Sequence, residues 1–371
     1  MYRKHRHSVL LSGTLLIVLM TAISACQPKG TPEPVEVIEE PIIIDETEPA
    51  VEEEPVWSPE LAFRLEHALE GNATKTINSV AFTHDGSQIA TAALHEVYVW
   101  DAATGSLVRS MEIPQSTGDG FAITRDDQAY VTSIAARGVW MVSAADGEEI
   151  FRLNSGYDSV LDISQDGDQI VTGNRDGVVW LWQAADGERL AEMDPADYED
   201  AAYSEWLSSI AFSPDGQIIA AGHWDGTIFL WDASDRVITR TLTPEEVGGK
   251  PEKLSFSVDG QYLAAAGGAD GFSNAWVVRI WNVSDGSLYQ SLAIGARNEA
   301  VAFSPDGTLL AAGDREGVTI WSYPDFELLY FIPNEKTDDN YFVTDLVFSP
   351  NSQFLVAGYS DHYALVWQVK E

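Results

Sequence analysis

An all-β domain made of seven repeated units, each of four short strands, is the fold that the sequence predicts for residues 57–371. The first observation is the period, because the anchor residues of the seven units lie 40 to 49 residues apart, which suits four strands with their turns. The second is a closing residue that is tryptophan in six of the seven units. Such units, repeated around a ring, are typical of a seven-bladed β-propeller of four-stranded antiparallel blades.

Residues 1–25 have the layout of a signal peptide. Basic residues at positions 3, 4 and 6 precede an apolar run from Val9 to Ile23, and a charged start followed by an apolar stretch directs export. The run leads into Cys26, the only cysteine of the chain. Ile23-Ser24-Ala25-Cys26 resembles the lipobox of bacterial lipoproteins, although isoleucine stands where leucine is usual. The resemblance implies that Cys26 is lipidated and becomes the mature amino terminus.

The alternatives to a lipid anchor are an uncleaved transmembrane helix, ordinary secretion and a buried core segment. The apolar run has about 15 residues, whereas a helix needs about 20 to span a bilayer. With a single cysteine, the chain has no disulfide framework. We therefore expect an exported protein that meets the membrane through its lipid anchor alone and faces the periplasm or the cell exterior.

Residues 26–56 are expected to form a disordered acidic, proline-rich linker that starts at the lipid anchor. Residues 27–56 contain six prolines and ten acidic side chains against the single Lys29, a composition that disfavours a packed core. In an extended, polyproline-like form this segment reaches roughly 90 Å. The apolar triplet Ile42-Ile43-Ile44 has two interpretations, a chance run in a flexible linker or a docking strand.

Each repeated unit begins with an alternating strand, a tight turn and a second strand rich in alanine and glycine. A third strand then ends in the closing residue. The clearest copies begin with residues 209–216 and 300–307, which both contain Phe-Ser-Pro-Asp-Gly. The seven anchors are Phe82, Ile123, Ile163, Phe212, Phe256, Phe303 and Phe348. The seven closing residues are Trp100, Val142, Trp182, Trp231, Trp281, Trp321 and Trp367.

The Pro-Asp-Gly strings between the first two strands of a unit have the chemistry of turns. Pro214 presets a φ of about −65°, Asp215 tolerates the bend, and Gly216 supplies a positive φ. The same interpretation applies to the strings that end at Gly147, Gly187 and Gly286, where the third strand reverses into the fourth. We therefore expect these aspartates to shape turns and not to act as active-site acids.

The repeats resemble those of the WD40 family. Trp100-Asp101 and Trp231-Asp232 match the dipeptide that names the family, and the Phe-Ser-Pro-Asp-Gly strings match its first hairpin. The resemblance covers roughly residues 60–371, and it implies a rigid platform for protein partners. The family's Gly-His pair ahead of the first strand is missing in every unit, so its His-Ser-Asp-Trp hydrogen-bond network is not carried over.

The last unit lacks a fourth strand, because only four residues follow Trp367. Residues 60–69 precede the first full unit and have the apolar pattern of an outer strand. We expect them to complete the seventh blade and close the ring, since an open sheet edge invites unwanted pairing. The alternative is a short amphipathic helix, which the spacing of Leu61, Leu65 and Leu69 favours.

No catalytic or cofactor motif is apparent in the sequence. The predicted mature chain has five histidines, at positions 67, 84, 95, 223 and 362, and their spacing matches no zinc motif. His223 either faces a ligand or lies in an exposed loop, and the acidic residues within 194–205 indicate a solvated loop, with a calcium site as the alternative. We expect no cofactor, no metal and no enzymatic activity.

Connectivity places the long loops on one face of the predicted propeller. In a four-stranded antiparallel blade, the second-to-third-strand loop and the connection to the next blade emerge on the same face. The long excursions are residues 193–206, 242–252, 267–276 and 333–342. Aromatic residues on this face are predicted to form a recognition surface, or alternatively to pack inward. They are Tyr198, Tyr203, Trp206, Trp224, Phe272, Trp276 and Tyr341.

The charge of the chain limits its partners. It has 58 acidic and 21 basic residues and a net charge of −37, so we expect no binding to nucleic acid or to an anionic membrane surface. Growth in salty surroundings would explain the same acidity. The favoured function is a monomeric scaffold that binds a basic or neutral protein, peptide or glycan. The alternative is a hydrolase or lyase that acts on an envelope glycan or ester in the central channel.

Overall fold

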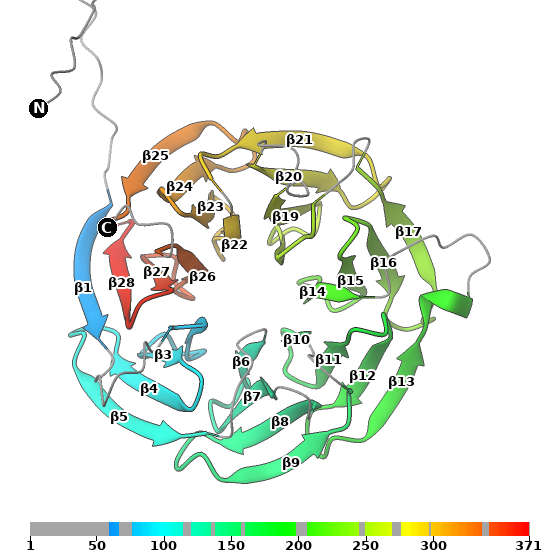
Figure 1. The fold of residues 1–371 in the computed structure, drawn as a ribbon, viewed down its shortest axis with the longest axis horizontal. Helices are drawn as coiled ribbons and strands as arrows, with labels where there is room; N and C mark the ends of the chain where they lie inside the picture. Colours follow the sequence, from blue (N-terminus) through cyan, green and yellow to red (C-terminus); the bar gives the residue numbers. More distant parts are fainter. Residues whose placement is uncertain are drawn as a thin grey trace, which may run out of the picture. The chain divides into compact units, whose positions relative to one another are not determined.

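The computed structural model shows seven four-stranded antiparallel sheets arranged as blades of a ring (Figure 1). It describes residues 59–66, 76–113, 120–134, 138–156, 160–197, 206–244, 249–268, 276–296, 298–335 and 341–370. The predicted seven-bladed β-propeller is confirmed. The signal peptide, Cys26 and the linker lie outside the described residues. Within the described part of the chain, no helix has the length and apolar character needed to cross a membrane.

The inner half of each blade consists of the strand that borders the channel and the strand next to it. The innermost strands are β2 (Ser79–Phe82), β6 (Phe121–Ile123), β10 (Val160–Ile163), β14 (Leu207–Phe212), β18 (Lys253–Phe256), β22 (Asn298–Phe303) and β26 (Val343–Phe348). The second strands are β3 (Gln88–Ala92), β7 (Ala129–Ile134), β11 (Gln169–Gly173), β15 (Ile218–His223), β19 (Tyr262–Gly268), β23 (Leu309–Asp314) and β27 (Phe354–Tyr359).

The outer half of each blade holds the third strand, with its closing residue, and the fourth strand at the rim. The third strands are β4 (Glu96–Asp101), β8 (Gly138–Ser143), β12 (Val179–Gln183), β16 (Ile228–Asp232), β20 (Trp276–Asn282), β24 (Gly317–Ser322) and β28 (Tyr363–Gln368). The fourth strands are β5 (Leu107–Glu112), β9 (Glu149–Leu153), β13 (Arg189–Met193), β17 (Ile238–Leu242), β21 (Leu288–Ala293), β25 (Leu328–Pro333) and β1 (Glu60–Glu66). A short 3₁₀ turn, Pro195–Asp197, follows β13.

The turn between β14 and β15 shows why the Ser-Pro-Asp-Gly string recurs. Ser213 Oγ donates to Asp215 Oδ1 at 2.6 Å and accepts a hydrogen bond from the Ile218 N–H at 2.9 Å. Gly216 has a φ of 69°, and no atom lies within 4 Å of where its Cβ would be. Backbone conformation, rather than lack of space, therefore requires glycine here. These aspartates are turn residues, as expected.

The closing residues lie on the third strands and are buried between neighbouring blades. Trp231, for example, has no exposed surface and packs in a cluster with Val171 and Leu181 of the preceding blade. The indole N–H of Trp100 donates to Thr91 Oγ1 at 2.8 Å. Blade 3 has the same contact between Trp182 and Thr172, at 2.9 Å. The full His-Ser-Asp-Trp network was not expected, but a hydrogen bond from the tryptophan N–H to a hydroxyl is present in these two blades.

The ring is closed by β1, which pairs antiparallel with β28 and completes the seventh blade. The prediction of a closing amino-terminal strand is therefore confirmed, and the helical alternative for this segment is wrong. Leu65 is fully buried, whereas Leu61 is 53% exposed. The segment forms a strand despite its helical leucine spacing, because β28 offers an edge with which it can pair. The Arg64 guanidinium also lies 3.6 Å from the ring centroid of Tyr363 on β28.

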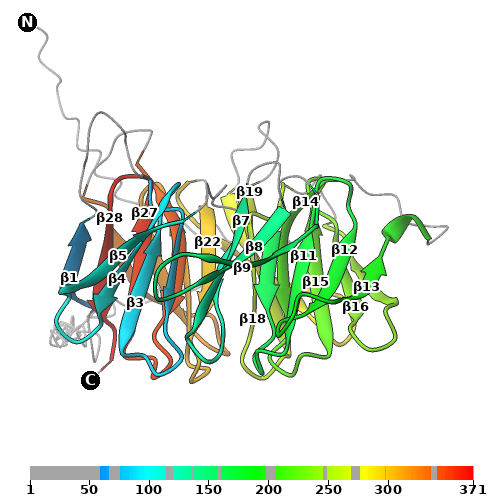
Figure 2. The same cartoon turned by 90° about the horizontal axis from the view of Figure 1, so that it is seen from below.

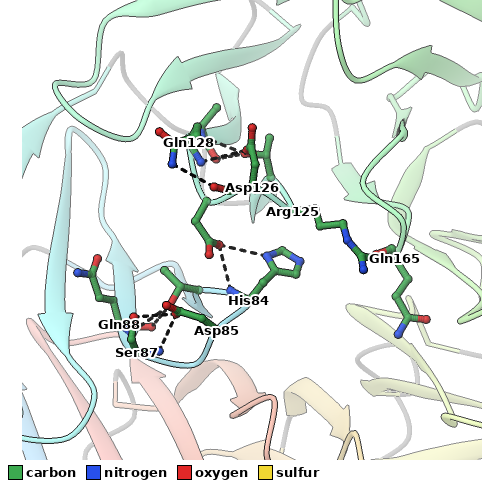
Figure 3. A network of polar contacts seen from close by, with 12 residues as sticks. His84, Asp85, Ser87, Gln88, Arg125, Asp126, Gln128 and Gln165 are labelled. Carbon is green, nitrogen blue, oxygen red and sulfur yellow. Dashed lines mark hydrogen bonds and ion pairs between the residues drawn. The ribbon is translucent and has the colours of Figure 1, made fainter.

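The two faces of the ring differ in their connections (Figure 2). We call the side that carries the first-to-second and third-to-fourth strand turns the turn face, and the opposite side the long-loop face. On the turn face, neighbouring blades are linked by their turns (Figure 3). The His84 N–H donates to Asp127 Oδ1 at 3.0 Å, and Arg125 donates to the Gln165 carbonyl at 2.6 Å. These contacts bridge blades 1, 2 and 3.

Candidate binding face and channel site

Trp206 and Trp224 form an exposed aromatic pair on the long-loop face. Trp206 directly precedes β14 and Trp224 directly follows β15, so both residues lie at the open end of the β14–β15 hairpin. Their rings meet edge to face with centroids 4.8 Å apart, and the Trp224 N–H donates to the Trp206 carbonyl at 2.9 Å. The side chains remain 39% and 46% exposed. The structure thus brings together two of the predicted recognition residues.

Two cations contact this Trp pair. The Arg175 guanidinium lies 4.9 Å from the ring centroid of Trp206, and the Lys250 ammonium lies 5.0 Å from that of Trp224. Cations over indole faces are held by the electrostatic attraction of the ring. Lys250 also pairs with Glu252 at 2.6 Å. Each ring of the pair therefore has a cation near it.

The other predicted recognition residues do not join this pair. Tyr341 is buried and stacks on Tyr359 with ring centroids 4.9 Å apart, and its hydroxyl contacts that of Tyr363. It therefore follows the inward-packing alternative. Trp276 is half-buried and begins β20, so its placement in a loop was wrong, because β19 and β20 extend further than expected. Tyr198, Tyr203 and Phe272 lie outside the described residues.

His223 also differs from its sequence-based interpretation. It ends β15, is fully buried, and packs edge to face against Phe229 with ring centroids 5.0 Å apart. Neither an exposed loop nor a ligand-facing position describes it. The reason is that β15 pairs with β14 as far as His223 and Leu207, which places the imidazole inside the blade and leaves Trp224 as the first residue outside the sheet.

The central channel holds two cavities that share lining residues. A cavity of about 330 Å³ lies at the start of the innermost strands, on the long-loop side. A second cavity, of about 340 Å³, lies towards the turn face. Both are lined by Asp162, Ala211 and Leu254. Lys250 also lines the first cavity, so the Trp pair and the channel mouth share one side chain.

Three charged residues that line the channel are Asp162, Lys253 and Asp345. Lys253 on β18 donates to Asp345 Oδ1 on β26 at 2.9 Å. The lysine side chain is 45% exposed inside the channel, whereas that of Asp345 is 8% exposed. Asp345 also accepts the Val80 N–H at 3.1 Å. It thereby connects the innermost strands of blades 7 and 1.

Asp162 connects blades 3 and 4 in the same way. Its Oδ2 accepts the Phe212 N–H on β14 at 2.8 Å. Burial raises the pKa of Asp162 to about 6, against the opposing effects of the Phe212 and Ile163 N–H groups and of Lys253. Burial lowers the pKa of Lys253, but the nearby carboxylates of Asp345 and Asp162 outweigh it, so that this pKa lies above its usual value.

The channel carboxylates of Asp162 and Asp345 therefore link neighbouring blades by accepting backbone hydrogen bonds. An innermost strand has an edge without a strand partner, and its N–H groups need acceptors. Asp162 and Asp345 supply them, and Ser255 Oγ does so for the Phe303 N–H at 3.2 Å. The sequence interpretation named no channel residue. The available signal was a charged or hydroxyl side chain within the small and apolar pattern of an innermost strand.

Metal binding finds no support in the described part of the chain. No group of three or more histidine, cysteine, aspartate or glutamate side chains there is placed to hold a metal ion. Of the acidic stretch considered for calcium, Asp194 accepts the Ala196 N–H at 2.8 Å, which caps the short turn Pro195–Asp197. Residues 198–205 of that stretch lie outside the described residues.

A comparison with protein families agrees with this architecture. The family model described as WD domain, G-beta repeat matches residues 63–101, 147–183, 200–232 and 331–368. Each matched segment includes the first three strands of one blade, in blades 1, 3, 4 and 7. The chain carries WD40 repeats. The remaining blades have the same four strands, although their first three strands lie outside the matched segments.

Curated relatives match part of the chain. Small ribosomal subunit protein RACK1 of Candida albicans is 32% identical over 120 residues, which are 31% of this chain and 36% of that protein. RACK1y of Oryza sativa subsp. japonica is 32% identical over 26% of this chain and 29% of that protein. RACK1 of Glycine max is 28% identical over 31% and 38%, respectively. The chain spans about a third of the length of these relatives.

Proposed function

We propose that this protein is a lipid-anchored binding module of the bacterial cell envelope that captures a protein partner on its long-loop face. The observation that carries the proposal is the exposed pair of Trp206 and Trp224, whose rings lie edge to face at 4.8 Å. Tryptophan is strongly enriched among the residues that dominate binding energy in protein interfaces. The WD40 repeats support the same function, because the family resemblance implies a rigid platform for protein partners.

The position of the pair suits an anchor for a partner. Trp206 and Trp224 adjoin the paired ends of β14 and β15, so the sheet fixes the backbone on which both side chains stand and lowers the cost of ordering on binding. Lys250 contacts the ring of Trp224 and also lines the channel cavity. A partner segment that covers the pair therefore reaches the channel mouth directly. With a net charge of −37 on the chain, a basic or neutral partner is favoured over an acidic one.

The binding test uses the full chain in its own host cells. A photoreactive phenylalanine analogue at position 224 should cross-link a protein partner, and the same analogue at position 108, on the outer strand β5, is the control. Substitution of both tryptophans by alanine should reduce retention of that partner on the purified protein at least about tenfold. Leu107→Ala should leave retention unchanged, since Leu107 is 50% exposed but lies at the rim.

The outcomes separate this proposal from others. Unchanged retention by the double alanine variant would place the interface elsewhere. Retention of a glycan in place of a protein, again lost in that variant, would keep the site and replace the partner class. Turnover of an envelope glycan or ester, with no partner retained, would support catalysis in the channel instead.

The location of the module rests on the amino-terminal sequence. Cys26 follows two small residues at the end of the apolar run, and we infer diacylation there with the acidic linker as a tether. One or two buried acyl chains give a membrane anchor without a membrane-spanning segment. Growth with an alkyne-labelled palmitate should label the wild-type protein and not Cys26→Ser. Equal labelling of both would remove the lipid anchor from the proposal.

A further inference from the structure

The rim strand of blade 6, β25, differs in composition from every other fourth strand of the propeller. Its sequence, Leu-Leu-Tyr-Phe-Ile-Pro, has one polar side-chain atom, the hydroxyl of Tyr330. Each of the other six fourth strands has at least two charged, hydroxyl-bearing or amide-bearing side chains. Natural sheets usually place charges along an edge, because an apolar edge invites pairing with another strand.

The apolar side chains of β25 are exposed. Leu328, Leu329 and Phe331 are 65%, 38% and 44% exposed. Tyr330 and Ile332 pack against the core cluster of blades 6 and 7, so the alternate positions Leu329 and Phe331 point to the other side of the strand. Within the described residues, β25 pairs with β24 alone, and Figure 1 shows it at the outer rim between β21 and β1.

Charges at the ends of β25 select what can pair with it. Asp325 and Glu327 precede the strand, Glu335 follows it, and all three are exposed. Glu335 also forms an ion pair with Arg64 of β1. Like charges placed opposite each other across paired strands are destabilising. A second copy of β25, antiparallel or parallel, brings acidic ends together. The chain's own apolar triplet, residues 42–44, is flanked by Glu39, Glu40, Asp45 and Glu46, and the same repulsion disfavours it.

We propose that β25 is a docking edge for an extended segment of a partner protein, apolar at alternate positions and with lysine or arginine at both ends. The segment adds a fifth strand to blade 6, with main-chain hydrogen bonds along the edge and side-chain contacts to Leu329 and Phe331. Its basic ends lie near Glu327 and Glu335. This surface is separate from the Trp206 and Trp224 pair on the long-loop face.

The experiment measures binding of a defined peptide to the full chain in mild detergent. The probe is the blocked peptide Lys-Lys-Val-Thr-Ile-Thr-Val-Lys-Lys, and the charge control replaces its four lysines by glutamate. The variant Leu329→Lys with Phe331→Lys should weaken binding of the probe at least about tenfold. The matched control, Leu107→Lys with Val108→Lys on β5, changes residues that are 50% and 48% exposed and should leave the affinity unchanged.

Amide hydrogen exchange supplies a second readout that does not depend on variants. The probe should slow exchange within Leu328–Pro333 and leave the β5 amides unaffected. The proposal is overturned if the two double-lysine variants bind alike, if the glutamate peptide binds as tightly as the probe, or if the probe does not bind the folded protein. A protein dimer that Phe331→Lys dissociates would identify a second copy as the occupant and also overturn it. Alanine at Trp206 and Trp224 should not affect the probe, so the two proposals fail independently.

Discussion

The ammonium of Lys253 on β18 donates a hydrogen bond to Asp345 on β26 at 2.9 Å and so connects blades 5 and 7 across the channel. Asp345 in turn accepts the Val80 N–H of blade 1 at 3.1 Å. One carboxylate therefore ties together three blades on both sides of the point where the ring closes. Because this link joins blades that are not neighbours, we expect it to oppose opening of the ring.

We predict that Lys253→Met destabilises the protein by about 1–2 kcal/mol. The substitution leaves a carboxylate that is 8% exposed without its cation, which is costly in a buried site. The exposure of the ammonium to channel water keeps the loss below that of a fully buried pair. Urea unfolding at pH 7 measures it. Lys370→Met is the control, because its partner Asp306 is 36% exposed, and an equal loss in both variants would contradict a special role for the channel pair.

Asp162 is predicted to make stability depend on pH. Its pKa in the folded protein is about 6, above its usual value of 3.8, so the folded state binds this proton more tightly than the unfolded state. The stabilising contribution is therefore complete below pH 3.8 and is lost as the pH rises through about 6. Its upper limit is about 3 kcal/mol, since one pKa unit corresponds to about 1.4 kcal/mol.

The variant Asp162→Asn isolates this effect, because its amide oxygen can still accept the Phe212 N–H. The free energy of unfolding of wild type minus variant, measured from pH 4 to pH 7.5, should fall as the pH rises. Parallel curves across this range would show that Asp162 does not titrate within it. All other carboxylates are common to both proteins and cancel in the difference.

The contact between Thr91 and Trp100 should be worth about 1 kcal/mol. Thr91→Val keeps the volume of the side chain but removes the oxygen that accepts the indole N–H at 2.8 Å, and a buried donor without its acceptor costs about 1–3 kcal/mol. A double-mutant cycle with Trp100→Phe measures the coupling. Additive losses would indicate packing alone.

In blades 4 to 7 the second-strand position equivalent to Thr91 holds alanine, at residues 221, 265, 312 and 357.

Much of the fold could be predicted from the sequence because repetition averages over local ambiguity. A single unit such as residues 121–143 is degenerate, yet seven units with one period fix the strand order of every blade. The closing strand was predictable for a different reason. Residues 60–66 have the apolar pattern of an outer strand, and they form β1, which pairs with β28.

The candidate site was less predictable, because it depends on where each strand ends. Strand β15 extends to His223, which places His223 inside the blade and leaves Trp224 just outside the sheet. The hydrogen bonds between blades in the channel were not predicted. Lys253 and Asp345 are 92 residues apart and approach each other only when the blades are arranged in a ring. Trp206 and Trp224 were both among the seven aromatic residues predicted for the long-loop face, but their contact was not predicted, because it depends on where β14 and β15 end.

The ring closure gives a last prediction, on β1. Leu65→Ala should destabilise the full chain by about 2–4 kcal/mol, because Leu65 is fully buried and its removal leaves a cavity between β1 and the core of blades 7 and 1. Leu61→Ala, at a side chain that is 53% exposed, should cost less than about 0.5 kcal/mol. Chemical unfolding of both variants provides the measurement.

Truncation extends this test from one side chain to the whole strand. A chain that begins at residue 57 keeps β1 and should unfold at the same denaturant concentration as the full-length protein. A chain that begins at residue 67 lacks β1, leaves the edge of β28 unpaired, and should aggregate or unfold at a lower concentration, because an unpaired apolar edge is a template for association. If the shorter chain is monomeric and equally stable, then β28 needs no partner and β1 does not hold the ring closed.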